Sequence, residues 1–470
     1  MERCDMDPQR IHMIAMCGTG MAALAGLLTA AGHRVCGSDT QVFPPMSILL
    51  SKIGVPCHSG YDPQQIAPDT SLVIVGNAVR ADNPEVLATL ARHIPYCSMP
   101  QALDRFFLKT RRPSVVVGTH GKTTTASLLA WTLMCAEQDP GMMIGGWMNN
   151  FNGNHRLGRP PHFVIEGDEY DTAFFDKGPK FLHYNPYYAI LTSIEQDHAD
   201  IYPDLSSIQA AFSKFVALLP QGGYLAAAAG SPAISEVVRR AACQSESYGV
   251  DVQADWQATS LCQVEERLHF DVFHHGEKVA AIESPLAGRH NVNNALGVMA
   301  IAHHLGVPWE TIQKAIFSFQ GVKRRQEVIA AVRDILIIDD FAHHPTAITE
   351  TLMALRLRYP RRRLFAVFEP RSMTSRRNLF QHAFVDAFAL ADQTFIAGIF
   401  APEKVPDGLR LDPAKVASDL VARGRCAEFI PTADAIVERL TEQLAPGDLV
   451  CIMSSGGFDA IYQKLVVALA

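Results

Sequence analysis

The stretch Gly118-Thr119-His120-Gly121-Lys122-Thr123-Thr124 decides the fold. It follows the apolar run 114–117, which predicts a strand, and precedes a helical pattern over about 123–137. Glycines let the backbone wrap around a phosphate, and the start of the helix directs N–H groups toward it. Lys122 adds positive charge, and a threonine hydroxyl can bind Mg²⁺. We therefore predict a nucleotide site, although the first glycine lies two residues closer to the lysine than in the common spacing.

Two more polar segments directly follow apolar runs that predict strands. They are Glu166-Gly167-Asp168-Glu169-Tyr170-Asp171 and Ser193-Ile194-Glu195-Gln196-Asp197-His198. The carboxylates of the first segment repel one another unless a cation lies among them, which favours Mg²⁺; a solvated acidic loop is the alternative. A lone histidine after a strand is more often structural than a ligand. Because the carboxyl ends of parallel strands meet at one sheet edge, we nevertheless expect Glu169 and His198 to serve the nucleotide site.

The amino-terminal segment imitates a dinucleotide fingerprint. Gly18-Thr19-Gly20-Met21-Ala22-Ala23 lies between a predicted strand over 11–16 and a predicted helix over 21–31, and Gly37-Ser38-Asp39 follows later. An acidic residue about 20 positions after the first glycine suits a ribose contact. The pattern is common, so it leaves open both a nicotinamide dinucleotide and a nucleotide sugar.

Four later segments carry weaker signals. They are Gly288-Arg289-His290-Asn291-Val292-Asn293-Asn294, Lys323-Arg324-Arg325, Asp339-Asp340-Phe341-Ala342-His343-His344-Pro345 and Glu369-Pro370-Arg371-Ser372. The asparagines suit an adenine edge, although capping a predicted helix over 295–305 is the default interpretation. The basic run is either solvated or a phosphate clamp. The last two segments follow predicted strands and suit ligand loops, where Arg371 can bind a carboxylate in bidentate fashion; ordinary loops are the alternative.

Length and composition indicate a cytoplasmic protein of about three domains. Short apolar runs that alternate with helical patterns predict α/β layering with largely parallel sheets. The 470 residues are 48% apolar and 19% charged, and the net charge of −7 argues against a nucleic-acid partner. Ten cysteines without a Cys-x-x-Cys pair favour reduced thiols over a disulfide framework or a zinc site. We place the domains at 1–110, 111–319 and 320–470, with a linker over 109–113 and an added β segment over 243–283.

A hydropathy window over 13–32 holds no charged residue, yet it does not predict a membrane span. Gly18-Thr19-Gly20 in its middle indicates a strand, a turn and a helix instead. Glu2, Asp5 and Asp7 ahead of it have the wrong sign for a signal peptide.

Taken in order, these motifs resemble those of the Mur ligases, the ATP-dependent amide-forming enzymes of peptidoglycan synthesis, and the resemblance spans nearly the whole chain. It implies three α/β domains. The first is a Rossmann-like amino-terminal domain for a UDP-sugar. The second is a central P-loop ATPase domain with a mostly parallel sheet, and the third is a Rossmann-like carboxy-terminal domain.

Within the family, several segments are similar to those of the members that attach a recycled tripeptide. They are Cys17-Gly18-Thr19, Val42-Phe43-Pro44-Pro45-Met46-Ser47, Gly76-Asn77-Ala78, Tyr170-Asp171-Thr172-Ala173-Phe174-Phe175-Asp176-Lys177, the segment 369–372, and Ser454-Ser455-Gly456-Gly457-Phe458. This likeness implies that ATP phosphorylates the lactyl carboxylate of UDP-N-acetylmuramic acid. The amine of L-alanyl-γ-D-glutamyl-meso-diaminopimelate would then attack the acyl phosphate. Members that attach L-alanine are the alternative.

The resemblance also implies roles for single residues. Lys122, Glu169, His198, Arg324, Asp340 and His343 would be catalytic. ATP would be bound by Gly118, Thr119, His120, Gly121, Lys122, Thr123, Thr124, Asn291, Asn294 and Arg324, and Mg²⁺ by Thr123, Glu169 and His198. The UDP-sugar and the peptide would contact Gly18, Thr19, Gly20, Met21, Ser38, Asp39, Asn77, Arg371, Ser372 and Ser455.

Three positions depart from the family pattern. Ser193 stands where the family usually has asparagine, which affects an ATP or metal contact, and Phe341 stands where it has tyrosine. Several members carry a carbamylated lysine near the position of Ser213.

Two functions of other classes compete with the ligase. A nicotinamide-dependent oxidoreductase would use the amino-terminal fingerprint but leave the phosphate loop without a role. A non-catalytic nucleotide-binding protein would leave the carboxylate and histidine loops unused. We expect small-molecule substrates, no nucleic acid, no membrane, and a monomer or weak homo-oligomer.

Overall fold

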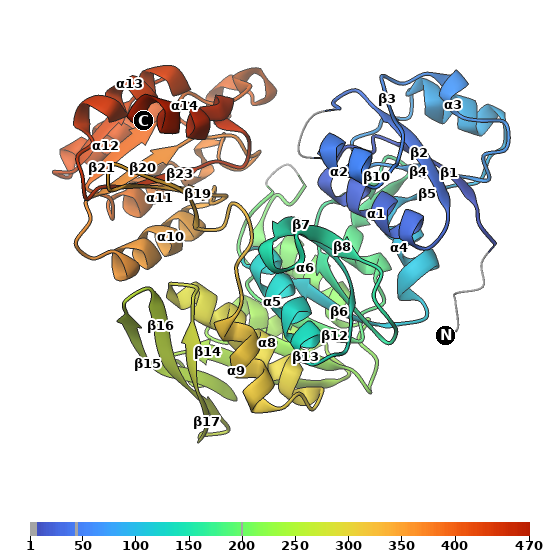
Figure 1. The fold of residues 1–470 in the computed structure, drawn as a ribbon, viewed down its shortest axis with the longest axis horizontal. Helices are drawn as coiled ribbons and strands as arrows, with labels where there is room; N and C mark the ends of the chain where they lie inside the picture. Colours follow the sequence, from blue (N-terminus) through green and yellow to red (C-terminus); the bar gives the residue numbers. More distant parts are fainter. Residues whose placement is uncertain (1–6, 43–45, 199–200) are drawn as a thin grey trace. The chain divides into compact units, whose positions relative to one another are not determined.

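The computed structural model describes residues 7–42, 46–198 and 201–470 (Figure 1). The expected motif over 42–47 falls in part on residues 43–45, which lie outside the described residues, as do Glu2, Cys4 and Asp5. The chain forms two compact units. The first holds Met1–Ile194, Ser206–Trp256 and Ala295–Ala315, and the second holds Glu195–Leu205, Gln257–Asn294 and Ile316–Ala470.

The amino-terminal sheet has five parallel strands in the order β3-β2-β1-β4-β5. Its elements are β1 (Arg10–Ile14), α1 (Thr19–Ala30), β2 (Arg34–Asp39), α2 (Met46–Lys52), β3 (Cys57–Ser59), β4 (Leu72–Val75), α3 (Pro84–Ala91), β5 (Tyr96–Ser98) and α4 (Met99–Leu103). Helix starts follow local chemistry: Asn83 caps α3 ahead of Pro84, and Ser98 forms a capping box with Gln101 on α4. The predicted Rossmann-like arrangement is present.

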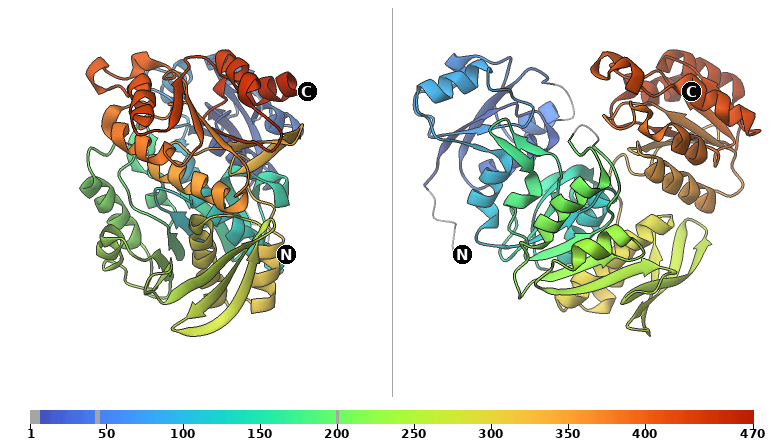
Figure 2. Two further views of the ribbon diagram at one scale, coloured as in Figure 1. Left: turned by 90° about the vertical axis from the view of Figure 1, so that its left-hand side faces the viewer. Right: turned by 180° about the vertical axis from the view of Figure 1, so that it is seen from behind.

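The central sheet has ten strands in the order β17-β16-β15-β14-β13-β12-β6-β9-β7-β8. The strands are β6 (Arg112–Val117), β7 (Gly141–Met148), β8 (Gly153–Arg156), β9 (His162–Gly167), β12 (Tyr188–Leu191), β13 (Tyr224–Ala228), β14 (Gln244–Val250), β15 (Trp256–Val264), β16 (Arg267–His274) and β17 (Glu277–Ser284). The helices are α5 (Lys122–Cys135), α6 (Leu205–Val216), α7 (Pro232–Val238), α8 (Arg289–His304) and α9 (Trp309–Phe317). Figure 2 shows the long strands of the added β segment, β15 to β17, in yellow-green.

A short hairpin, β10 (Asp171–Ala173) and β11 (Asp176–Pro179), follows the acidic run of the central sheet. Its tip carries Phe174 and Phe175, which pack against the amino-terminal core cluster that contains Ile14 and Val75. The ring of Phe175 meets the ring of Tyr96 edge-on, with centroids 5.1 Å apart. The hairpin thus connects the central sheet to the amino-terminal sheet inside the first unit.

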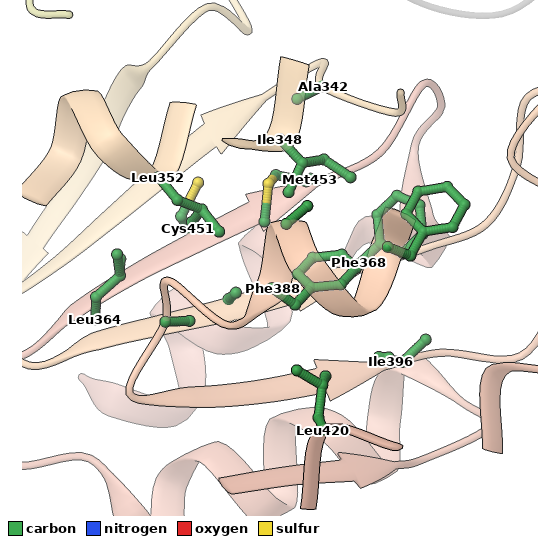
Figure 3. Packing of buried hydrophobic residues seen from close by; sticks show 14 of the residues in the cluster. Ala342, Ile348, Leu352, Leu364, Phe368, Phe388, Ile396, Leu420, Cys451 and Met453 are labelled. Atoms are coloured by element: carbon green, nitrogen blue, oxygen red, sulfur yellow. The ribbon is translucent and has the colours of Figure 1, made fainter. Parts of the chain in front are cut away.

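The carboxy-terminal sheet has the order β18-β19-β23-β20-β21-β22, and only β18 is antiparallel to its neighbour among the printed pairs. Its elements are β18 (Glu327–Val332), β19 (Ile335–Asp340), α10 (Pro345–Arg358), β20 (Leu364–Phe368), α11 (Gln381–Phe388), β21 (Gln393–Ile396), α12 (Pro413–Ala422), β22 (Cys426–Phe429), α13 (Ala433–Gln443), β23 (Leu449–Met453) and α14 (Ile461–Leu469). Figure 3 shows the core of this sheet, where Phe368 packs against Phe388. Their ring centroids are 5.2 Å apart.

Three predicted boundaries are wrong. The expected linker over 109–113 ends early, because Arg112 and Pro113 already pair in β6. Helix α8 begins at Arg289, so the capping interpretation of the asparagines is wrong. Asp339 and Asp340 lie in β19 rather than after it.

No helix among the described residues is long and apolar enough to cross a membrane. The uncharged window near the amino terminus is β1, a turn and α1.

A buried ion pair joins β1 of the amino-terminal sheet to α3. His12 Nε2 lies 3.0 Å from Glu85 Oε2, and both side chains are fully buried. Ser38 donates its hydroxyl to the same oxygen, and the backbone N–H of Asp62 donates to Glu85 Oε1. Burial opposes the charge of His12, but hydrogen bonds with Cys36 and Glu85 and the charge of Glu85 raise its pKa to about 9.

We predict that Glu85→Gln lowers stability by about 3–5 kcal/mol, because it leaves a buried imidazolium without its counter-charge. The pKa of His12 is higher in the folded protein than the unfolded value of about 6.5. Its ion pair with Glu85 therefore stabilises the fold fully below about pH 6.5, and this stabilisation is lost as the pH rises to about 9. Thermal unfolding between these pH values should therefore show a falling midpoint in the parent and a flatter profile in the variant.

Asp69→Asn is the matched control, because Asp69 pairs with Arg10 on the surface with 64% of its side chain exposed. Equal losses from the two variants would contradict the prediction.

Candidate functional site

The phosphate loop leaves β6 between two parallel neighbours, β9 and β12. Gly121 caps α5 with a φ of +82°, a conformation that favours glycine. Gly118 has a φ of +132°, and a Cβ there would collide with Thr192 Oγ1. Both glycines of the motif are therefore required by the backbone and by the adjacent β12 turn.

Ser193 holds the loop from the β12 side. Its carbonyl accepts the N–H of Thr119 at 3.0 Å, and its hydroxyl accepts the N–H of His120 at 2.8 Å. Ser193 is the departure from the family asparagine noted above. In this chain a short side chain at that position shapes the phosphate loop itself.

Lys122 and Glu169 form an ion pair at the centre of this sheet edge. Lys122 Nζ lies 2.9 Å from Glu169 Oε2, and it also donates to the carbonyls of Gly118 and Thr119. Burial opposes the charge of Lys122, but Glu169 and Asp168 outweigh it and raise its pKa. The lysine is thus charged and lies within the loop that should enclose the phosphates.

The side-chain oxygens of Thr123 and Glu166 are further candidate metal ligands. The Thr123 hydroxyl donates to Glu166 Oε2 at 2.9 Å, and the N–H of Gly145 donates to Glu166 Oε1 at 2.5 Å. With Glu169, these are hard oxygen ligands with an excess of negative charge, which is the donor chemistry that Mg²⁺ prefers. The residues present therefore fit a magnesium ion.

His198 belongs to the second unit, whereas Lys122 and Glu169 belong to the first. The backbone N–H of His198 donates to Asp197 Oδ1 at 2.7 Å and to Thr374 Oγ1 at 3.1 Å. Burial opposes the charge of Asp197. The charges of His198 and His343 and a hydrogen bond from Thr374 outweigh that effect and lower its pKa. The expected convergence of His198 and Glu169 stays a prediction.

Arg324 joins the start of the carboxy-terminal domain to its last loop. Its Nε donates to Asp339 Oδ2 at 3.1 Å, and its Nη2 donates to the carbonyls of Ser454 and Gly456 at 2.7 and 2.8 Å. The Arg324 guanidinium also lies 5.2 Å from the Phe341 ring centroid, a cation–π contact where the family has tyrosine.

Arg371 lies at the other side of the same loop. Its guanidinium is 3.6 Å from Glu369 Oε1 and stacks over the ring of Phe400 at 3.7 Å. Glu369 Oε2 accepts the hydroxyl of Ser454, and Ser454 Oγ accepts the N–H of Gly456. Arg324 and Arg371 are thus connected through the loop that contains the predicted residue Ser455.

Three other predicted residues of this domain make internal hydrogen bonds. Asp340 accepts the N–H groups of Gln326 and Ala342, and His343 Nδ1 lies 3.0 Å from the Phe341 carbonyl. The Ser372 hydroxyl donates to Ser375 Oγ at 2.9 Å.

Asn291 and Asn294, the two predicted asparagines of α8, are buried in its first turns. Asn291 donates to the carbonyl of Ala287 at 2.8 Å, and Asn294 donates to Asn291 Oδ1 at 3.2 Å.

Only part of the predicted amino-terminal site is exposed to a ligand. Asp39 accepts the N–H groups of Cys17 and Gln41 at 2.8 and 2.9 Å, and the Ser38 hydroxyl faces Glu85. Gly18 caps α1, and Gly18, Thr19 and Asn77 are exposed, whereas Met21 is buried and Gly20 is partly buried. The exposed start of α1 is the part that can meet a diphosphate.

Three family models together match most of the chain. They are the Mur ligase family catalytic domain over 10–111, the Mur ligase middle domain over 116–302 and the Mur ligase glutamate ligase domain over 324–456. The chain belongs to the Mur ligase family. It is therefore an enzyme of the ATP-dependent amide-ligase type.

Two curated Mur ligases and one solved structure are similar over nearly the full length. UDP-N-acetylmuramate–L-alanyl-γ-D-glutamyl-meso-2,6-diaminoheptandioate ligase of Escherichia coli is 40% identical, covering 98% of both chains. UDP-N-acetylmuramate–L-alanine ligase of Syntrophotalea carbinolica is 32% identical, covering 97% of both. The crystal structure of a murein peptide ligase from Psychrobacter arcticus is 36% identical with a TM-score of 0.72, covering 98% of both chains.

Ser193, Glu166 and Glu369 were not predicted as site residues, although each lies in a segment that was predicted to carry chemistry. Each stands at or just after the end of a strand in the structure. Their place in the same segments as the predicted residues Glu169, His198 and Arg371 was the available signal. These three residues matter because of hydrogen bonds with partners that are distant in the sequence. Local sequence patterns do not reveal such partners.

We predict that Lys122→Ala lowers nucleotide turnover about 100- to 1,000-fold or more, because it removes the charge that should stabilise the transferred phosphate. Phosphate release from ATP measures the loss. Calorimetric binding of a UDP-sugar should be nearly unchanged. Lys278→Ala is the control, because Lys278 on β17 forms a half-exposed ion pair with Asp271 on β16. Loss of UDP-sugar binding with preserved turnover would overturn the assignment.

Proposed function

We propose that this Mur ligase joins L-alanyl-γ-D-glutamyl-meso-diaminopimelate to the lactyl carboxylate of UDP-N-acetylmuramic acid, using ATP, in peptidoglycan recycling. The observation that carries the proposal is the loop network that ends in Arg371, because a multiply charged peptide requires cationic groups that L-alanine does not. The greater identity to the tripeptide ligase than to the alanine ligase supports it.

ATP is needed because a carboxylate has no adequate leaving group at neutral pH. One lactyl carboxylate oxygen attacks the γ-phosphorus, and ADP leaves with the electrons of the broken P–O bond. The peptide amine then attacks the acyl carbon, the C–O bond breaks, and inorganic phosphate leaves while the nitrogen loses a proton. Water must be kept from the acyl phosphate between the two steps.

The first unit would bind the triphosphate and the UDP-sugar. Lys122 and the N–H groups at the start of α5 would hold the β- and γ-phosphates. The start of α1 at Gly18 would receive the diphosphate of the sugar nucleotide. Mg²⁺, held by Thr123 and Glu169 and by His198 of the second unit, would supply positive charge against the triphosphate.

The second unit would supply the remaining groups. Asn291 and Asn294 would meet the adenine. Among the described residues, Arg324 uses Nε and Nη2 for its hydrogen bonds, so Nη1 is the atom that we assign to the γ-phosphate. Asp340 holds the Gln326 and Ala342 backbone near this arginine, and His343 would close over the nucleotide.

Arg371, Ser372 and Ser455 would bind the distal carboxylates of the peptide. The negative net charge of the chain and the chemistry of the substrates are consistent with a cytoplasmic enzyme that acts on small molecules, without a nucleic-acid or membrane partner. We propose a monomer or a weak homo-oligomer.

The decisive experiment measures phosphate release from Mg-ATP and UDP-N-acetylmuramic acid with either the tripeptide or free L-alanine. We expect turnover with the tripeptide only. Turnover with L-alanine only would replace the proposal with the alanine ligase, the second candidate. Silence with both amines would favour a non-catalytic nucleotide-binding protein.

We predict that Arg371→Ala raises the KM for the tripeptide about 10- to 100-fold with a smaller effect on kcat, because a charge-assisted hydrogen bond to a carboxylate is lost. The KM for ATP should stay unchanged. Arg439→Ala is the control, because Arg439 forms an ion pair with Glu428 on the surface between α13 and β22. An unchanged tripeptide KM would remove Arg371 from the peptide site.

A further inference from the structure

Two cysteines lie in contact at the edge of the amino-terminal sheet. Cys17 is in the turn between β1 and α1, and Cys57 is the first residue of β3. Their sulfur atoms are 3.4 Å apart, and both residues are partly exposed. They are reduced in the structure, and 40 positions separate them in the sequence.

This contact is built into the expected nucleotide-sugar site. Cys17 directly precedes Gly18, the cap of α1, and its N–H donates to the Asp39 carboxylate at 2.8 Å. Cys57 lies near the same carboxylate: in the parallel pair of β2 and β3 it stands opposite Gly37, two residues before Asp39, and the Asp39 charge raises its pKa. Cys17 is therefore bound both to the start of α1 and to the carboxylate that holds this turn.

We propose that Cys17 and Cys57 are a modification site, where a peroxide forms a reversible intramolecular disulfide that weakens binding of the sugar nucleotide. The binding effect rests on the proposed function, whereas the bond itself does not. A disulfide requires the sulfurs to approach to about 2.05 Å, more than 1 Å closer than they lie now. Closing that gap pulls the turn that carries Gly18 toward β3.

The chemistry balances with a peroxide as the oxidant. The Cys17 thiolate attacks one peroxide oxygen, the O–O bond breaks, and hydroxide leaves, so that the sulfur becomes a sulfenic acid. The Cys57 sulfur then attacks the sulfenic sulfur, and the S–O bond breaks. Water leaves with the Cys57 proton. A small dithiol reverses the reaction by thiol–disulfide exchange.

Both thiols are protonated at neutral pH, because each has a raised pKa. Burial raises the pKa of Cys17, although its hydrogen bond with Cys57 acts in the opposite direction. Burial, the hydrogen bond and the charges of Cys17 and Asp39 raise the pKa of Cys57 to about 12. Cys17 is therefore the first nucleophile, and the reaction should accelerate as pH rises.

The test exposes the full-length enzyme to excess hydrogen peroxide and maps its peptides without reduction. We expect a peptide pair joined through Cys17 and Cys57, lighter by two hydrogen atoms, that disappears with dithiothreitol. The Kd for UDP-N-acetylmuramic acid should rise about tenfold or more on oxidation and return on reduction.

Cys57→Ser is the matched variant. It keeps the other cysteines, including the exposed Cys262 and Cys426. It should form no joined peptide pair, and its Kd should rise less after peroxide than that of the parent, because its Cys17 stops at the sulfenic acid. Absence of the joined peptides would overturn the site. A joined pair with an unchanged Kd would overturn its effect on binding. If the reduced enzyme binds no UDP-N-acetylmuramic acid, the proposed function fails while the peptide map still tests the bond.

Discussion

The ion pair between Lys122 and Glu169 is the constraint on which the central site depends. A lysine at the start of α5, one loop after β6, and a carboxylate after β9 can meet only because the two strands are adjacent and parallel, with their carboxyl ends at one edge. Gly118 and Ser193 add a second condition, since the loop must pass close to the β12 turn. The sheet order thus comes before the chemistry: another strand between β6 and β9 would separate the charges.

In the carboxy-terminal domain, an arginine connects segments that are distant in the sequence. Arg324 lies at the entrance of the domain and Ser454 lies after its central strand β23, yet one guanidinium binds both Asp339 and that loop. Glu369 then connects the loop to Arg371. Ser454 is buried and each of its polar atoms forms a hydrogen bond. The network therefore fixes the positions of the two arginines relative to each other, in addition to balancing their charge.

Much of this architecture was predictable from local patterns. The strands around the phosphate loop and strand β20 follow from short apolar runs, an added β segment was expected over 243–283, and the three-domain α/β fold is confirmed. Helix α8 was placed too late because its polar first turns lack the apolar signal, although Asn291 and Asn294 are buried there through hydrogen bonds with their own turn. Partners such as Glu85 for Ser38 were not predictable, because only the tertiary fold brings them together.

The hairpin of β10 and β11 bears on how such enzymes can be recombined. Glu169 binds the phosphate-loop lysine, and only a few residues later Phe174 and Phe175 lie against the amino-terminal core beside Tyr96. The amino-terminal domain therefore cannot be exchanged without affecting the acidic segment of the central domain. A chimaera that exchanged it at the domain junction would also have to exchange the hairpin tip, or match its aromatic surface, to keep the acidic segment in register with the phosphate loop.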